Sequence, residues 1–367
     1  MKAIERAYRN GQSLWLDNIT RELLTSGTLV RYIRELAVKG VTSNPTIFDH
    51  AIRQGSAYDA AIREQLAAGL AGEQLFFELA LQDLTAAADL FRELHEQTSG
   101  VDGWVSLEVS PLLARDARTT LAEAKELHAR AGRPNLYIKI PGTAEGLPAI
   151  EEAIFAGVPI NVTLLFSPKQ YLAAAEAYLR GVERRIEAGL NPNVSSVASV
   201  FISRWDAAVA ERVPKRLVNM LGLAIGRSTY HAYSGLLGSA RWRQAFNAGA
   251  RAQRLLFAST GTKDPKASDV LYVRGLNAPL TVNTVPESTL KAFADHGEID
   301  ARWTQDTQAS ERVLEGFRLA GIDLDALAKR LQDEGAASFV TSWNDLLGVI
   351  AAKSSSLGVG RPPHADS

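Results

Sequence analysis

The chain has 367 residues, of which 46% are hydrophobic and 22% charged, a composition typical of a globular protein that buries a large core. Its 40 Lys and Arg residues nearly balance its 41 Asp and Glu residues, so the formal net charge of −1 does not favour nucleic acid or another polyanion as a partner. Cysteine is absent, which excludes disulfides, thiolate zinc sites and thiol catalysis.

Short runs rich in β-branched residues alternate along the chain with longer amphipathic stretches. This alternation predicts parallel strands joined by helical crossovers. Eight strands are expected, which is the number in a closed (β/α)8 barrel, so we predict an α/β TIM barrel with extra helices. The predicted strands are 13–19, 40–44, 104–109, 136–140, 160–165, 197–202, 255–259 and 280–283.

Helices are expected between these strands, for example over 119–130 and 168–187. Ser167 and Pro168 form an N-cap and first-turn pair for the second of them. Two helical insertions, 56–96 and 203–253, lengthen the basic unit. Both are interpreted as packing elements, so residues 1–353 are predicted to form a single barrel domain.

The last part of the sequence, 311–351, predicts two helices. The second carries an apolar stripe at helical spacing, which is typical of core. Residues 354–367 are rich in Gly and Pro, and this composition predicts a disordered tail. The stripe consists of Phe339, Trp343, Leu346, Leu347 and Ile350.

In such a barrel the functional side chains lie at the carboxyl ends of the strands. Lys139 ends an apolar strand, and burial there would disfavour its ammonium form, lower its pKa and make the amine a nucleophile towards carbonyls. Residues two apart share a strand face, so Asn161 and Thr163 can point inwards together. The other polar residues at strand ends are Asp17, Asn18, Thr42, Asn44, Glu108, Ser199, Arg204, Ser259 and Lys263.

Each of these residues has a simpler explanation when it is taken alone. Lys139 beside Glu108 could be a structural ion pair. Asn44 could be a turn residue, and Ser199 a satisfied core hydroxyl. Their co-occurrence at one rim favours a functional site, because burying so many polar groups without a purpose costs free energy.

Other kinds of site are disfavoured. None of the six histidines ends a predicted strand, so a metal centre is not expected. Neither a P-loop nor a strand-linked dinucleotide motif is present in the sequence. The first residues lack the apolar core of a signal peptide and no apolar run is long enough to cross a membrane, so we expect a cytoplasmic protein.

At the residues of this rim the chain resembles the transaldolase family, and the likeness extends from about residue 13 to about residue 350. The order and number of the matching runs make the resemblance specific. The length of the chain and the continuation 141–143 resemble the long bacterial type. The matching runs are 14–17, 40–46, 105–109, 137–141 and 160–167.

The resemblance implies that a dihydroxyacetone unit is transferred between sugar phosphates, as in the pentose phosphate pathway. Sedoheptulose 7-phosphate and glyceraldehyde 3-phosphate would give erythrose 4-phosphate and fructose 6-phosphate. Lys139 would form the Schiff base, and Asp17 would take the proton from the hydroxyl on the fourth carbon. Glu108, with a water held by Thr163, would shuttle protons during carbinolamine formation and dehydration. No metal or organic cofactor is expected.

Substrate binding also follows from the resemblance. Asn44 and Asn161 would hydrogen bond hydroxyls of the three-carbon unit and hold it until an acceptor arrives. Ser199 and Arg204 would bind phosphate, since a guanidinium can clamp phosphate oxygens.

The chain departs from the commoner family pattern at the phosphate site. Many relatives carry a glycine before this arginine and a second arginine after the seventh strand, whereas this sequence has Ser203 and, further on, Lys263. Lys263 is the candidate for the second positive charge, with the Gly261 backbone as an anion-binding nest. A solvated loop lysine is the alternative.

Two alternatives to transfer stay open. One is a Schiff base aldolase of the same fold that releases the three-carbon product to water. The other is a noncatalytic barrel that binds sugar phosphates or a protein partner. Because bacterial members of the family are often dimers, a homodimer is a further expectation from the resemblance.

Overall fold

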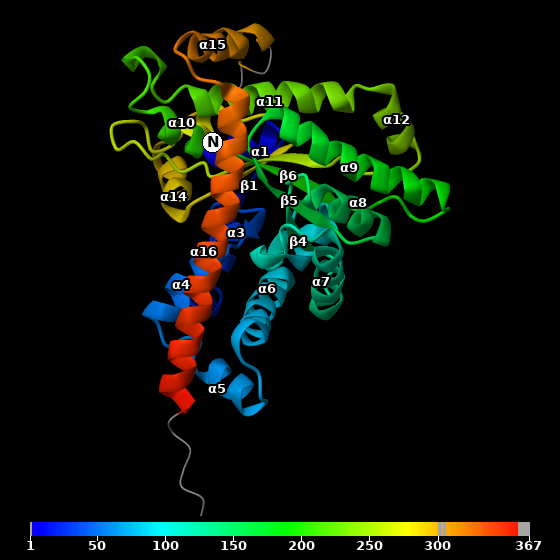
Figure 1. Ribbon diagram of the computed structural model, residues 1–367, viewed down its shortest axis with the longest axis vertical. Coiled ribbons are helices and arrows are strands. Elements are labelled where there is room, and N and C mark those ends of the chain that lie inside the picture. Colours follow the sequence, from blue (N-terminus) through cyan, green and yellow to red (C-terminus); the bar gives the residue numbers. More distant parts are fainter. Residues whose placement is uncertain (1, 300–302, 304–305, 359–367) are drawn as a thin grey trace, which may run out of the picture.

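The computed structural model describes residues 2–299, 303 and 306–358 and contains a closed barrel of eight parallel strands (Figure 1). Each strand pairs with its sequence neighbours, and β8 pairs with β1 to close the barrel. This confirms the predicted (β/α)8 fold. The strands are β1 (Gln12–Asp17), β2 (Gly40–Thr42), β3 (Trp104–Glu108), β4 (Leu136–Pro141), β5 (Ile160–Leu165), β6 (Ser196–Phe201), β7 (Arg254–Ala258) and β8 (Thr281–Val285).

Almost every strand residue is buried, as expected for a parallel sheet whose outer face is covered by helices. The first helices along the chain are α1 (Ala3–Arg9), α2 (Arg21–Thr25), α3 (Thr28–Glu35), α4 (Pro45–Gln54), α5 (Asp59–Ala67), α6 (Gly72–Gln97), η1 (Pro111–Leu113), α7 (Ala117–Ala131) and α8 (Gly146–Ala156). They are followed by α9 (Pro168–Glu187), α10 (Ser203–Val209), η2 (Lys215–Leu217), α11 (Leu221–Leu237), α12 (Ala240–Asn247), α13 (Leu271–Gly275), α14 (Glu287–His296), α15 (Thr307–Leu319) and α16 (Leu324–Gly358).

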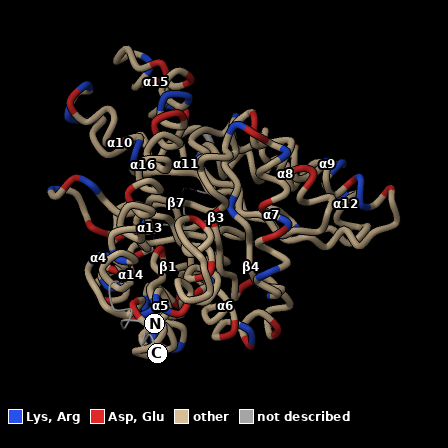
Figure 2. The backbone as a smooth tube through the Cα atoms, turned by 60° about the horizontal axis from the view of Figure 1, so that its bottom comes forward, with Lys and Arg blue, Asp and Glu red and all other residues tan. Residues whose placement is uncertain are grey.

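The local signals for helices are confirmed. The side chain of Ser167 accepts a hydrogen bond from the Gln170 N–H at 3.2 Å, and the Gln170 side chain accepts one from the Ser167 N–H, so a capping box starts α9. The predicted insertions are the helices α5 and α6 and the segment from α10 to α12. Figure 2 shows Lys and Arg interspersed with Asp and Glu along the helices around the barrel. Among the described residues, no helix is both long and apolar enough to span a bilayer.

The two predicted helices of 311–351 are α15 and α16, and α16 extends beyond the predicted end at 351. It runs from the α15 end of the molecule along α4 and down to α5 (Figure 1). It also continues through 354–358, where the sequence predicts a tail, and residues 359–367 lie outside the described part. Leu357 packs against the core, and Lys353 donates a hydrogen bond to the Ile52 carbonyl at 2.9 Å. These contacts stabilise the end of the helix.

Polar side chains pair with one another at the amino end of the barrel. Arg254 donates hydrogen bonds to the Ser13 hydroxyl at 2.7 Å and to the Asp102 carboxylate at 3.2 Å, and Ser13 donates to the same carboxylate. These three side chains satisfy one another's hydrogen-bonding groups below the barrel core. The cavity that carries the predicted polar residues lies at the opposite, carboxyl end.

Candidate active site

A cavity of about 340 Å³ opens at the carboxyl ends of the strands. Its wall combines strand ends with α4 and α16, so it is built from segments that lie far apart in the sequence. Of the predicted site residues, Asp17, Asn44, Lys139, Asn161, Thr163, Ser199 and Arg204 line it.

Lys139 is held inside the mouth of the barrel by strand β4. Its amine donates a hydrogen bond to the Ser43 carbonyl at 3.0 Å and to the Glu108 carboxylate at 3.1 Å. Its side chain is only 8% exposed. Glu108 lies opposite Lys139 in the β3–β4 pairing, and Asn161 lies opposite it in the β4–β5 pairing. The strand register therefore sets a carboxyl, an amine and an amide side by side in one row.

Glu108 is deeply buried, and burial raises its pKa although the Lys139 ammonium opposes the shift. Only one carboxylate oxygen contacts the amine. The other, Oε1, has no hydrogen-bond partner, and the same holds for the buried hydroxyl of Thr163. Two polar atoms at the site thus keep hydrogen-bonding capacity for a water molecule or a substrate hydroxyl.

Asp17 ends strand β1 and, unlike Glu108, lines the cavity itself. Burial raises its pKa, while Lys139, the Thr42 hydroxyl and Lys263 oppose the shift. Thr42 is its register partner on β2 and donates a hydrogen bond to its carboxylate at 2.9 Å. The site therefore contains two carboxyls that favour protonation more than a solvated acid does, beside one amine.

A chain of hydrogen bonds crosses the cavity wall. Ser199 donates to the Asn161 carbonyl oxygen at 2.7 Å, and the Asn161 amide donates to the Ser106 hydroxyl at 3.1 Å. Asn44 has the local structural role that its sequence context suggests, because its side chain accepts the Ile47 N–H and caps α4. It lines the cavity as well.

Arg204 stands on α10 at one side of the cavity. Its guanidinium lies over the Phe201 ring, 5.3 Å from the centroid, and burial lowers its pKa. It makes no hydrogen bond or ion pair with the described residues. The neighbouring Ser203 and Ser259 hydroxyls are 3.0 Å apart. Glu334 of α16 acts on Arg204 electrostatically without forming an ion pair, so this half-buried guanidinium keeps its hydrogen-bond donors for an anionic ligand.

Lys263 is the one predicted binding residue that does not line the cavity. Its side chain is exposed, in the loop after β7. Its charge opposes the rise in the pKa of Asp17, so it acts on the same end of the barrel. Direct contact of Lys263 with a ligand stays a prediction.

Strand β5 contains an irregularity beside the site. Its register against β6 shifts between Val162 and Leu165, and Leu164 adopts a positive φ of 59°. A bulge of this kind leaves backbone groups unpaired and is frequent next to functional sites. Gln332 of α16 compensates, because its side-chain amide donates to the Leu164 carbonyl at 2.9 Å and to the Gly142 carbonyl at 3.1 Å. Helix α16 is thereby fixed across the rim.

The same helix supplies site residues that the sequence analysis missed. Ser338, Phe339 and Ser342 line the cavity, and the centroid of the Phe339 ring is 5.9 Å from the Lys139 amine. Phe339 therefore packs against the core, as its stripe predicts, and also lines the cavity. Trp343, by contrast, is buried. A pattern of apolar residues indicates that one face of a helix is buried. It does not indicate whether that face packs against the core or over an active site.

The chain resembles known proteins over nearly its whole length. Residues 14–350 match the family model described as transaldolase/fructose-6-phosphate aldolase. A transaldolase from Thermobifida fusca is 45% identical, with 93% of this chain and 95% of the relative covered. A protein named transaldolase 1 from Streptomyces avermitilis is 42% identical, over 95% of this chain and 94% of the relative. A Mycolicibacterium smegmatis transaldolase is 43% identical, over 92% and 93%.

Proposed function

The chain belongs to the transaldolase/fructose-6-phosphate aldolase family, and from this premise we propose that it is a transaldolase acting through a Schiff base on Lys139. It moves a dihydroxyacetone unit from sedoheptulose 7-phosphate to glyceraldehyde 3-phosphate, which yields erythrose 4-phosphate and fructose 6-phosphate. The observation that carries the proposal is the Lys139 amine, buried at the barrel mouth 3.1 Å from the Glu108 carboxylate.

Schiff base formation is the first chemical step. The unprotonated amine attacks the ketose carbonyl at the second carbon and gives a carbinolamine, which loses water to become an iminium ion. Glu108 gives and takes the protons of these two stages, and a water bound to Glu108 Oε1 and the Thr163 hydroxyl relays them. A raised pKa suits this role because an acid or base works best when its pKa is close to the working pH.

Cleavage of the bond between the third and fourth carbons follows. Asp17 takes the proton from the hydroxyl on the fourth carbon, the aldose phosphate leaves, and the bonding electrons pass into the iminium group to form an enamine. When the acceptor aldehyde enters, the enamine carbon attacks it and Asp17 returns the proton to the new alkoxide. Hydrolysis of the second Schiff base frees Lys139.

The remaining polar residues bind the substrate. Asn44 and Asn161 hydrogen bond the hydroxyls of the three-carbon unit and keep it in place between the two half-reactions. Arg204 and Ser199 bind the phosphate, and Lys263 adds positive charge from the loop after β7. The iminium group is the electron sink, so the reaction needs no metal or organic cofactor.

Compartment and assembly are part of the proposal. Charged sugar phosphates cross a bilayer poorly, so an enzyme that consumes them works where they are made, which we take to be the cytoplasm. We also propose a homodimer, following the habit of bacterial members of the family. Light scattering of the purified protein tests the second point, and a monomer at micromolar concentration would count against it.

The proposal is tested by trapping the iminium ion. Borohydride added with fructose 6-phosphate should leave a stable three-carbon adduct on Lys139, identified by mass spectrometry of peptides. Lys139→Met, which keeps the length of the side chain without the amine, is the matched control and should stay unmodified. Unmodified wild-type protein would refute the Schiff base and favour the noncatalytic barrel.

The runner-up is an aldolase that releases dihydroxyacetone to water. The family description covers both activities, so this alternative has an observation in its favour. Fructose 6-phosphate is supplied with and without erythrose 4-phosphate, and both products are followed. Sedoheptulose 7-phosphate formed much faster than free dihydroxyacetone indicates a transaldolase, and the reverse indicates an aldolase.

A further inference from the structure

We propose that Phe339 of α16 determines how strongly the enzyme favours transfer of the three-carbon unit to an acceptor aldehyde over its release into water. The Phe339 ring shields the bound three-carbon unit from water. This inference rests on the proposed function and adds a specificity-determining residue to it. Phe339 belongs to the wall of the cavity and its ring centroid is 5.9 Å from the Lys139 amine.

Position is the first argument. In a Schiff base the second and third carbons of the ketose are one and two bonds beyond the Lys139 nitrogen. A ring whose centroid is 5.9 Å from that nitrogen is close enough to contact these carbons. The groups that hold the nitrogen from below and beside it are polar, namely Glu108 and the Ser43 carbonyl. Phe339 faces the same nitrogen with an apolar surface.

The second argument is that α16 is held firmly over the mouth. Gln332, two turns before Phe339, donates to two rim carbonyls, those of Leu164 and Gly142. Ser342, on the turn after Phe339, accepts a hydrogen bond from the Thr46 hydroxyl of α4 at 3.0 Å. The helix is therefore tied to the barrel on both sides of the ring.

Close packing between these two ties gives a third argument. Gly335 has no side chain where α16 crosses the rim, and a Cβ there would lie 3.0 Å from a Leu164 methyl and 3.4 Å from the Arg204 guanidinium. The small residue lets the helix approach the barrel closely. Phe339, one turn later on the same face, is thereby brought down to the reacting atoms.

The chemistry explains why such a cover matters. Release of the unit without an acceptor needs a proton on the third carbon of the enamine, which restores the iminium ion. A water molecule then adds to the second carbon, and the C–N bond breaks, so dihydroxyacetone leaves and the Lys139 amine is free again. Transfer needs neither this protonation nor this water before the acceptor arrives. An apolar ring over the enamine slows release selectively, because it keeps water away from the third carbon, whose protonation only release requires. Water addition at the second carbon, by contrast, also ends the transfer reaction.

The experiment compares two rates in each variant. Transfer is the formation of sedoheptulose 7-phosphate from fructose 6-phosphate at saturating erythrose 4-phosphate. Release is the formation of free dihydroxyacetone from fructose 6-phosphate alone. Phe339→Ala should raise the ratio of release to transfer by about tenfold, an effect of the size expected when one apolar contact at a reacting centre is lost.

Three further variants distinguish loss of the apolar cover from misfolding and from general loosening of α16. Phe339→Leu retains an apolar cover and should keep a ratio close to that of the wild type. Phe339→Val loses less packing than alanine, so it serves if Phe339→Ala does not fold, and its ratio should rise in the same direction. Leu347→Ala, two turns further along α16 and outside the cavity wall, is the matched control for general loosening of the helix. Its ratio should not change.

The possible outcomes separate the two proposals. An unchanged ratio in Phe339→Ala or Phe339→Val, or an equal rise in Leu347→Ala, overturns the shielding role even if transfer becomes slower. Borohydride trapping on wild-type Lys139 is measured in parallel. Failure of that trapping refutes the Schiff base itself, whereas normal trapping with an unchanged ratio refutes only the role of Phe339.

Discussion

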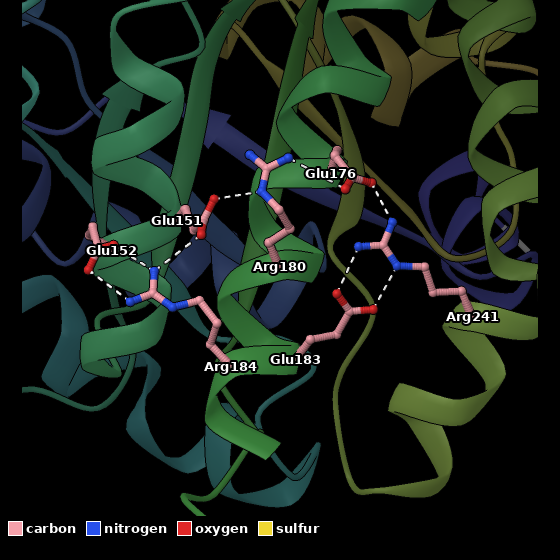
Figure 3. Close-up of polar contacts among 7 residues, drawn as sticks. All are labelled: Glu151, Glu152, Glu176, Arg180, Glu183, Arg184 and Arg241. Carbon is pink, nitrogen blue, oxygen red and sulfur yellow. Dashed lines mark hydrogen bonds and ion pairs between the residues drawn. The ribbon is translucent and has the colours of Figure 1, made fainter. Parts of the chain in front are cut away.

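Two regions of this molecule pair basic side chains with glutamates in different surroundings. Lys139 and Glu108 meet at the barrel mouth with side chains that are 8% and 6% exposed. On the outer surface, three arginines and four glutamates of α8, α9 and α12 form a network in which Arg241 and Glu176 are 43% and 41% exposed (Figure 3). The network members are Glu151, Glu152, Glu176, Arg180, Glu183, Arg184 and Arg241.

The carboxyl groups respond in opposite directions. In the outer network the hydrogen bond from Arg241 holds the pKa of Glu176 below its ordinary value. At the mouth, burial raises the pKa of Glu108 in spite of the adjacent lysine. A solvated ion pair favours charge on both partners at little desolvation cost, whereas a buried pair is opposed by that cost. An ion-pair partner alone therefore does not determine the protonation state of a carboxyl. The buried pair is the one suited to proton transfer.

The largest expected effect comes from removing the nucleophile. Lys139→Ala should lower turnover at least about ten-thousandfold, because among the described residues no other lysine lines the cavity to form the iminium ion. Lys139→Met separates the loss of the amine from the loss of volume and should be equally inactive. Turnover above a few per cent in either variant would show that Lys139 belongs with the structural pairs of the outer network.

Neutralising each carboxyl of the mouth should slow a different step. Glu108→Gln should reduce the rate of adduct formation, and Asp17→Asn should reduce carbon bond cleavage more than adduct formation, each by about a hundredfold to ten-thousandfold. Single-turnover measurements with borohydride quenching resolve the two steps. Equal defects at both steps in both variants would refute this division of labour.

Arg204 offers a contrast with the paired arginines of the outer surface. Arg204→Ala should raise the KM for a sugar phosphate about tenfold to a hundredfold, the usual effect of losing a charge-assisted hydrogen bond, with a smaller effect on kcat. Arg184→Ala in the outer network is the control and should leave KM unchanged. An unaltered KM in Arg204→Ala would remove this residue from the phosphate site.

Glu123 on α7 shows the effect of burial on the pKa of a carboxyl that has no ion-pair partner among the described residues. Burial raises its pKa from 4.5 to about 7, with a hydrogen bond from the Ser110 N–H opposing the shift. Between pH 4.5 and 7 the folded protein therefore binds more protons than the unfolded chain, so the contribution of Glu123 to stability falls as pH rises through this window.

Glu123→Gln stays neutral and keeps an oxygen that can accept the Ser110 N–H. It should raise Tm at pH 8 and change it little at pH 4, where the carboxyl is protonated in the folded state. Thermal unfolding at both pH values measures this, with Glu126→Gln on the same helix as control. The same change at both pH values would contradict the assignment.

The smallest effect is expected in the outer network. Arg241 donates two hydrogen bonds to Glu183 and one to Glu176, yet these groups are solvated. Arg241→Ala should cost less than about 1 kcal/mol and should cost even less at high salt, where surface pairs are screened. Thermal unfolding at low and high salt tests this, and a large loss independent of salt would mean that the network behaves like a buried pair.

Local patterns were sufficient to predict most of the barrel. The predicted strands agree with the structure because short β-branched runs in a parallel sheet are buried on both faces. Helix α9 follows its prediction because Ser167, Pro168 and Gln170 form the start of the helix among themselves. Such signals are contained within a few residues, so no knowledge of the rest of the fold is needed.

The candidate site was predictable only in part. Lys139, Asn161 and Asp17 stand at strand ends, and the topology of a barrel brings strand ends together. Phe339 gave no such signal, because it belongs to an apolar stripe whose other members are core residues. The role of Gln332 could not be predicted either. It binds backbone carbonyls beside the register shift in β5, and no sequence pattern predicted that shift.

The amino-acid sequence by itself determined the succession of strands and helices and the presence of an amine at the end of the fourth strand, since both depend on interactions between near neighbours. Only the tertiary structure decided which groups surround that amine. Closing the barrel sets the register that places Glu108 and Asn161 beside Lys139. The docking of α16 then brings Phe339 to the cavity wall. Burial in the folded barrel raises the pKa of the two carboxyls.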